Sequence, residues 1–240
     1  MMAKRLGVIG GLGPLATAYF YELITRMTDA GSDQEHLEVY IISKPQIPDR
    51  TDYILGRSKN SPLEYLLKVG RTLDSMGADC IAMPCITAHY FHRELSEGIK
   101  APIINIVNET AKYLKDHGTG TAGIMATEGT IRSGLFQNEL VKYDIKPVIP
   151  SPDGQSLVTD IIYRNVKAGV PVNMDSFHAV TDELKKNGAD TIILGCTELS
   201  MIKRDYPIGL GFIDALEVLA MCSITACGAR LKKEYENLIT

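Results

Sequence analysis

Residues 76–89, MGADCIAMPCITAH, and residues 187–200, NGADTIILGCTELS, are two copies of one pattern, 111 positions apart. In each copy a Gly-Ala-Asp turn leads into a short apolar run that ends at a cysteine, Cys85 or Cys196. Short apolar runs bounded by turn residues are typical of buried strands, and a helix is expected to start after each cysteine. The repeat therefore predicts a chain made of two halves with similar strand and helix order.

Strands and helices alternate outward from the first copy. Apolar runs predict strands at residues 4–9 and 37–43, in addition to the strand at residues 79–83 in the first copy. Helical patterns follow these strands at residues 14–28, 62–76 and from 87. The polar segment 44–61 predicts a loop that returns toward a site. This alternation predicts an α/β fold with two pseudo-symmetric domains, each a mostly parallel sheet flanked by helices. Ligands of such sheets bind beyond the carboxyl ends of the strands, which places the site in the cleft between the domains.

A weaker echo sets the boundary between the halves. LGVIGGLGP at residues 6–14 aligns with AGIMATEGT at residues 122–130, glycine on glycine at two positions. We expect the first half to span residues 1–118 and the second half residues 119–213. A final helix is predicted over residues 214–237 and has no clear counterpart in the first half. Segment 214–240 is expected to pack back on the first half.

Composition restricts the class of protein. The chain has 240 residues, 45% of them hydrophobic and 22% charged, as in ordinary globular enzymes. A formal charge of −4 argues against a nucleic-acid partner, which would require a basic face. No apolar run is long enough to span a membrane, and the N-terminus lacks the pattern of a signal peptide. We expect a cytoplasmic protein with a small-molecule substrate.

Five cysteines do not form a disulfide framework in a chain of this size, and none belongs to a CxxC zinc motif. Cys80 lies within a predicted strand, and Cys222 and Cys227 lie in an apolar helix, so these three are predicted to be core residues. Cys85 and Cys196 instead follow strands at positions where helices begin. A helix N-terminus lowers a thiol pKa from its free value of about 8.5. Two such groups on opposite sides of a substrate have the geometry of racemisation, in which one removes the Cα proton and the other returns one.

Together with these cysteines, five segments carry a family resemblance: MPCITAH and LGCTEL around the cysteines, GGLGP, PDRT and ATEGT. They resemble the aspartate/glutamate racemase superfamily, and the aspartate racemase branch most closely. The resemblance covers nearly the whole chain in the same order. It implies an amino-acid racemase that uses no pyridoxal phosphate and no metal, and that forms a homodimer. It also implies that Cys85 and Cys196 are the two catalytic acid/base residues.

The resemblance further implies substrate-binding residues beside the thiols. Thr87 and Thr197 match residues that hold the α-carboxylate and amine of the substrate, and Glu198 matches an acidic residue that orients the amino group. Thr127 and Thr130 are the second-half counterpart of the glycine-rich first turn.

Two cations and one departure from the family pattern bear on specificity. Arg50 and Lys167 match positions that pair with substrate carboxylates, and a protein of negative net charge needs local cations to attract a dicarboxylate. Ile86 stands where the family usually has Asn, a residue expected to contact the substrate carboxylate. Ile86 is therefore predicted to line the substrate site and to alter specificity.

Four other interpretations are open at this stage. Gly11-x-Gly13-x-x-Ala16 is similar to a dinucleotide-binding turn, but no acidic residue ends the next strand. Cys85, His89 and His92 share one face of a helix and are candidate metal ligands without a fourth partner. A silent amino-acid-binding protein would not need two opposed thiols. Decarboxylases of the same fold keep one catalytic cysteine, whereas cis–trans isomerases keep both.

Overall fold

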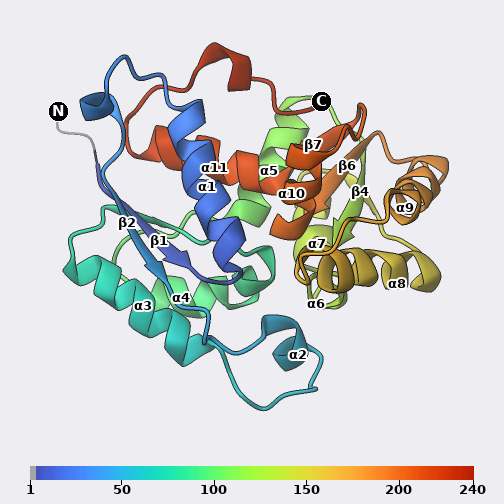
Figure 1. Cartoon of the computed structure of the whole chain (residues 1–240), viewed down its shortest axis with the longest axis horizontal. Helices are drawn as coiled ribbons and strands as arrows, with labels where there is room; N and C mark the ends of the chain where they lie inside the picture. The colour runs from blue at the N-terminus through green and yellow to red at the C-terminus, as the bar shows by residue number, and fades with distance from the viewer. Residues whose placement is uncertain (1–3) are drawn as a thin grey trace.

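The computed structural model describes residues 4–240 and contains two parallel sheets (Figure 1). The first sheet has the strand order β2-β1-β3 and the second the order β5-β4-β6-β7. All strand pairs within the sheets are parallel, and helices flank both sheets. The predicted α/β class with two similar sheets is confirmed. The strands are β1 (Leu6–Gly10), β2 (Val39–Ser43), β3 (Cys80–Ala82), β4 (Thr121–Ala126), β5 (Lys146–Val148), β6 (Thr191–Gly195) and β7 (Phe212–Asp214).

The α-helices follow the strands, as the alternation predicted. In the described residues they are α1 (Pro14–Met27), α2 (Arg50–Ile54), α3 (Leu63–Ser75), α4 (His92–Gly98), α5 (Ile106–Asp116), α6 (Glu128–Arg132), α7 (Leu135–Lys142), α8 (Pro152–Asp160), α9 (Met174–Lys186), α10 (Thr197–Asp205) and α11 (Ala215–Ala226). Short 3-10 helices lie at η1 (Asp33–Glu35), η2 (Ile86–Phe91) and η4 (Lys233–Tyr235), and a π-helix at η3 (Ile161–Val166). None of these helices is long and apolar enough to cross a membrane.

The final helix is shorter than predicted. It ends at Ala226 because Gly228 adopts a left-handed conformation, φ 80°, which glycine tolerates best. The amide of Ala229 then donates to the carbonyl of Ile224 at 3.1 Å, as in a glycine-terminated helix end. Beyond this end the chain turns away and forms an antiparallel bridge between Leu231 and Thr28.

The final helix also has a counterpart in the first half, contrary to the sequence-based expectation. Ile81 and Ile192, which the repeat aligns, pair in parallel with Ile103 and Phe212. Two residues after each partner, Asn105 caps α5 and Asp214 caps α11 through side-chain oxygens. α5 and α11 are therefore equivalent elements, and they pack against each other and lie with α1 between the two sheets (Figure 1). One apolar core includes residues of both helices and of both sheets.

Asp214 is a buried carboxyl group whose ionisation the fold opposes. Burial, followed by the charge of Glu217, raises its pKa to about 7. The unfolded chain releases this proton near its ordinary pKa of about 3.9. Between these two values the folded state holds one more proton than the unfolded state, so the free energy of unfolding falls as the pH rises.

We expect Asp214→Asn to remove this dependence between about pH 4 and 7, by up to about 1.4 kcal/mol per pH unit. Asparagine keeps an oxygen for the two hydrogen bonds that Asp214 accepts, from Ser200 and from the amide of Leu216. Urea unfolding at several pH values measures the slope. Asp175→Asn, at an exposed position in the first turn of α9, is the control for a lost charge. An unchanged slope in Asp214→Asn would contradict the prediction.

Candidate active site

The two cysteines occupy equivalent positions at the carboxyl ends of the two sheets. Cys85 follows β3 and is the residue before η2, and Cys196 follows β6 and is the residue before α10. Both have extended backbone conformations. Each thiol thus lies where a strand ends and a helix begins, as the repeat predicted.

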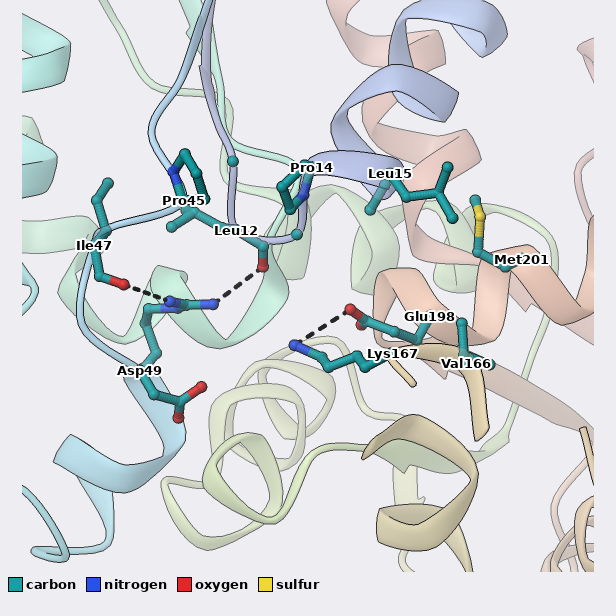
Figure 2. A pocket seen from close by; sticks show the side chains of 14 residues that line it. Leu12, Pro14, Leu15, Pro45, Ile47, Asp49, Val166, Lys167, Glu198 and Met201 are labelled. Atoms are coloured by element: carbon teal, nitrogen blue, oxygen red, sulfur yellow. Dashed lines mark hydrogen bonds and ion pairs between the residues drawn. The ribbon is translucent and has the colours of Figure 1, made fainter. Parts of the chain in front are cut away.

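Both cysteines line one narrow crevice of about 20 Å³. Its walls come from both halves of the chain. Nine of the ten predicted site residues contribute to it: Arg50, Cys85, Ile86, Thr87, Thr127, Lys167, Cys196, Thr197 and Glu198. The crevice adjoins a wider cavity of about 450 Å³, which shares Leu12, Asp49, Arg50, Lys167 and Glu198 with it (Figure 2). The wider cavity has room for an amino acid, whereas the crevice beside the thiols is much smaller.

Thr130, the tenth predicted residue, lies behind the crevice wall. Its hydroxyl oxygen is 3.1 Å from that of Thr87 and 3.0 Å from that of Thr127, and these two are 2.9 Å apart. The three buried hydroxyls form a closed triangle between the halves. Thr130 therefore supports Thr87 and Thr127 and does not itself face the crevice.

Arg50 starts the short helix α2 within the predicted loop 44–61. Asp49 caps this helix by accepting a hydrogen bond from the amide of Asp52 at 2.9 Å, a feature that the loop prediction missed. The Arg50 guanidinium is buried and donates to the carbonyls of Pro48 at 3.0 Å and Leu12 at 3.1 Å. Burial alone would lower the pKa of Arg50, but its neighbours Cys85 and Asp49 outweigh this effect and raise the pKa. Its Nε has no partner among the described residues and is a donor available to an anion.

Glu198 connects the second thiol to a cation. Cys196 Sγ donates to one carboxylate oxygen of Glu198 at 2.9 Å, and Lys167 Nζ lies 3.3 Å from the other. Figure 2 shows Lys167 and Glu198 as an ion pair on one side of the wider cavity. Burial, and then the Glu198 charge, raise the pKa of Cys196 well above its ordinary value, although Lys167 opposes this. The predicted net lowering of the thiol pKa is therefore wrong for Cys196, because burial and the Glu198 charge outweigh the backbone amide in the first turn of α10.

Ile86 lines the crevice, but its side chain is buried, 2% exposed, in the core cluster shared by the halves. We expect Ile86→Asn to lower the free energy of unfolding by about 2–4 kcal/mol, because it removes apolar contacts and buries an amide. Denaturant unfolding measures this loss. Ile86→Val, which keeps an apolar side chain, should cost only about 1 kcal/mol. Equal stability of Ile86→Asn and the wild type would show that the side chain is not a core group.

Sequence reasoning missed Tyr163, which also lines the crevice. It lies in the π-helix η3, and Lys167 Nζ sits 5.1 Å from the centre of its ring. Burial raises the pKa of Tyr163 to about 12. Single-turn π-helices occur frequently at functional sites, but no pattern in YRNVKAG distinguishes one from an ordinary helix.

The glycine-rich first turn has a structural explanation. Gly11 has φ 89°, and a Cβ there would collide with the backbone nitrogen of Lys44. Its amide donates to Thr17 at 2.9 Å. This turn packs closely against the loop after β2, and Gly13 adjoins Glu198.

The histidines beside the first thiol face backbone oxygens. His89 Nδ1 lies 3.0 Å from the Cys85 carbonyl, and His92 Nε2 lies 3.1 Å from the Ile103 carbonyl. Residues 4–240 contain no group of three or more His, Cys, Asp or Glu side chains placed to hold a metal ion. Burial lowers the pKa of His89 to about 4, so its ring is neutral at neutral pH.

A family model described as Asp/Glu/Hydantoin racemase matches residues 9–222. The chain belongs to this racemase family. The racemase is 27% identical over 227 residues to the broad specificity amino-acid racemase RacX of Bacillus subtilis (strain 168), covering 92% of this chain and 96% of the relative. The resemblance to aspartate/glutamate racemases seen in the sequence is confirmed.

Solved structures agree with this assignment. The racemase superposes on Picrophilus torridus aspartate racemase with a TM-score of 0.83 and 34% identity, over 97% of each chain. Glutamate racemase from Francisella tularensis shares the fold, with a TM-score of 0.67 and 16% identity, over 99% of this chain and 85% of that one. The chain is an amino-acid racemase of the Asp/Glu type, an isomerase.

Proposed function

We propose that the racemase uses Cys85 and Cys196 as a two-base pair and needs neither pyridoxal phosphate nor a metal. The observation that carries this proposal is that both thiols, at equivalent strand ends of the two sheets, line one crevice. One thiolate takes the Cα proton and becomes a thiol. The opposite thiol gives its proton to the other face of the carbanion and becomes a thiolate. In the reverse reaction the two cysteines exchange roles.

Glu198 and Thr87 have separate tasks in this proposal. Burial and the Glu198 charge raise the pKa of Cys196, so the thiol needs a proton acceptor before it can act as a base, and Glu198 Oε2 lies 2.9 Å from its sulfur. The hydroxyls of Thr87 and Thr127 and the first amides of α10, at Thr197, offer donors to the α-carboxylate.

We propose aspartate as the first substrate to test. Arg50 supports this choice because its buried Nε is an unpaired donor among the described residues. Lys167 is a second cation that lines the same crevice. The relative with 34% identity is an aspartate racemase from Picrophilus torridus. We further propose a cytoplasmic homodimer with halves at residues 1–118 and 119–213, the last segment belonging with the first half.

Proton NMR in D2O tests the proposal. Dialysed, chelator-treated protein should remove the Cα–H signal of L-aspartate, and chiral chromatography should recover both enantiomers. A panel of other L-amino acids, glutamate first, measures specificity. Turnover that returns only when pyridoxal phosphate or a metal is added would overturn the cofactor-free mechanism. Loss of signal for other amino acids but not for aspartate would overturn the choice of substrate alone.

A further inference from the structure

Ser200 lies one helical turn after Cys196 and is completely buried. Its hydroxyl donates to Asp214 Oδ1 at 2.7 Å. Asp214 is the last residue of β7, where it pairs with Leu194 of β6, two residues before Cys196. The same oxygen accepts the amide of Leu216 at 2.9 Å and so caps α11. Asp214 thus joins the first turn of α10 to the sheet and to α11.

A second contact lies one turn farther along α10. Lys203 Nζ is 2.7 Å from Glu217 of α11, and both side chains are mostly buried. Ser200 and Lys203 therefore form one polar seam against α11. Glu198 and Cys196 contact each other at the crevice. The charged and titratable groups that act on Asp214 are Glu217 and Lys203, and Asp214 in turn acts on Tyr19 of α1.

We propose that Ser200 and Asp214 are positioning residues for Cys196. They fix the first turn of α10 so that the thiol meets Glu198 at the crevice. The proposal rests on the two-cysteine function proposed above. A displacement of about 1 Å in a reacting group can cost about a hundredfold in rate, so a hydrogen bond that fixes this turn matters for catalysis.

In the first half, a different residue occupies the position equivalent to Ser200. His89 aligns with Ser200 in the repeat and lies four residues after Cys85. Its two ring nitrogens lie 3.0 Å from the Cys85 carbonyl and 3.3 Å from the Ile104 carbonyl. Ile104 follows Ile103, which pairs with β3 as Phe212 pairs with β6. In each half, the residue four positions after the cysteine lies between the cysteine's turn and the neighbouring strand segment, although the neutral His89 ring can donate to only one of its two carbonyls.

The test separates the two thiols by using a reaction that needs only one of them. In 3-chloroaspartate, removal of the Cα proton by a thiolate lets the electron pair form a Cα–Cβ double bond while chloride leaves from Cβ. The enamine product then hydrolyses to a keto acid and ammonia. Each enantiomer presents its proton to one cysteine only. Cys85→Ser and Cys196→Ser therefore identify the enantiomer that each thiol attacks.

We expect Ser200→Ala to slow chloride release from the enantiomer assigned to Cys196 at least tenfold, and from the other enantiomer less than twofold. Asp214→Asn keeps an oxygen that can accept the Ser200 hydrogen bond. Its rate of chloride release should therefore stay within threefold of the wild-type rate for both enantiomers. His89→Gln should show the opposite preference to Ser200→Ala. Mass spectrometry gives a readout independent of substrate: the iodoacetamide alkylation rate of Cys196 should change at least threefold in Ser200→Ala, and that of Cys85 less than twofold.

Equal losses for both enantiomers, in a protein of unchanged thermal stability, would overturn the positioning role. So would alkylation rates and chloride release that match the wild type. A wild-type protein that neither racemises aspartate nor releases chloride would instead overturn the proposed function, and the alkylation comparison would still decide whether Ser200 acts on Cys196.

Discussion

Replacing Cys85 or Cys196 with serine is expected to reduce racemisation by about three to four orders of magnitude, because each turnover uses both groups. A serine hydroxyl is far too weak an acid to supply a base at neutral pH. Each single variant should still exchange deuterium at Cα of one enantiomer, since the remaining thiolate can remove and return a proton on its own face. The two variants should show opposite enantiomer preferences. Chiral chromatography measures racemisation, and mass spectrometry measures deuterium.

The other three cysteines provide matched controls. Cys80 and Cys227 lie in the core with their sulfurs 3.5 Å apart, and Cys222 lies 3.7 Å from Glu109. Their serine variants should retain racemase activity, with stability losses of about 1–2 kcal/mol that are typical of core changes. Full activity in Cys85→Ser or in Cys196→Ser would remove the basis of the two-base mechanism.

Most of the fold was predictable because its signals are local. Apolar runs that end in glycine or cysteine marked β1, β3 and β6, and helical periodicity marked α1 and α3. Helix α2 was missed because five residues are too few to show a period, and its main signal is the cap at Asp49. The final helix was predicted too long because the prediction used the apolar pattern alone and ignored Gly228, whose left-handed conformation ends the helix.

The equivalence of α5 and α11 was hidden for a different reason. The spacing between the halves shortens from 111 to 109 positions after the cysteines, as the partners of Ile81 and Ile192 show. The capping residues also differ, Asn105 in one half and Asp214 in the other, although both accept amide hydrogen bonds. Several residue types can cap a helix by accepting an amide hydrogen bond, so a comparison that looks for identical residues in the two halves does not find the cap.

The candidate site was predictable as a set of residues but not as a set of charges. The repeat alone indicated that two cysteines end equivalent strands. The pKa of Cys196 was not predictable, because a helix N-terminus contributes only about 0.3–1 kcal/mol, whereas full burial shifts a pKa by several units. Burial and the contact with Glu198 are tertiary features that no local spacing reveals.

These charges make Glu198→Gln the most informative substitution after the cysteines themselves. The Glu198 charge raises the pKa of Cys196, and Lys167 lowers it. Glutamine removes the first effect and leaves Lys167 without its carboxylate partner, 3.3 Å away in the wild type. Both changes act in the same direction, so the pKa of Cys196 should fall, and alkylation of Cys196 should become faster near neutral pH.

Racemisation by Glu198→Gln should nevertheless fall about a hundredfold. Glutamine cannot accept the proton that Cys196 must release. A Cys196 thiolate that Lys167 stabilises is a weaker base than one of higher pKa, and it carries no proton to return to the substrate. Lys167→Met is the matched opposite, because loss of the cation should raise the pKa of Cys196 and slow its alkylation. The pH dependence of alkylation, followed at Cys196 by mass spectrometry, measures both shifts. Identical alkylation profiles in the two variants and the wild type would show that Glu198 and Lys167 do not control the second thiol.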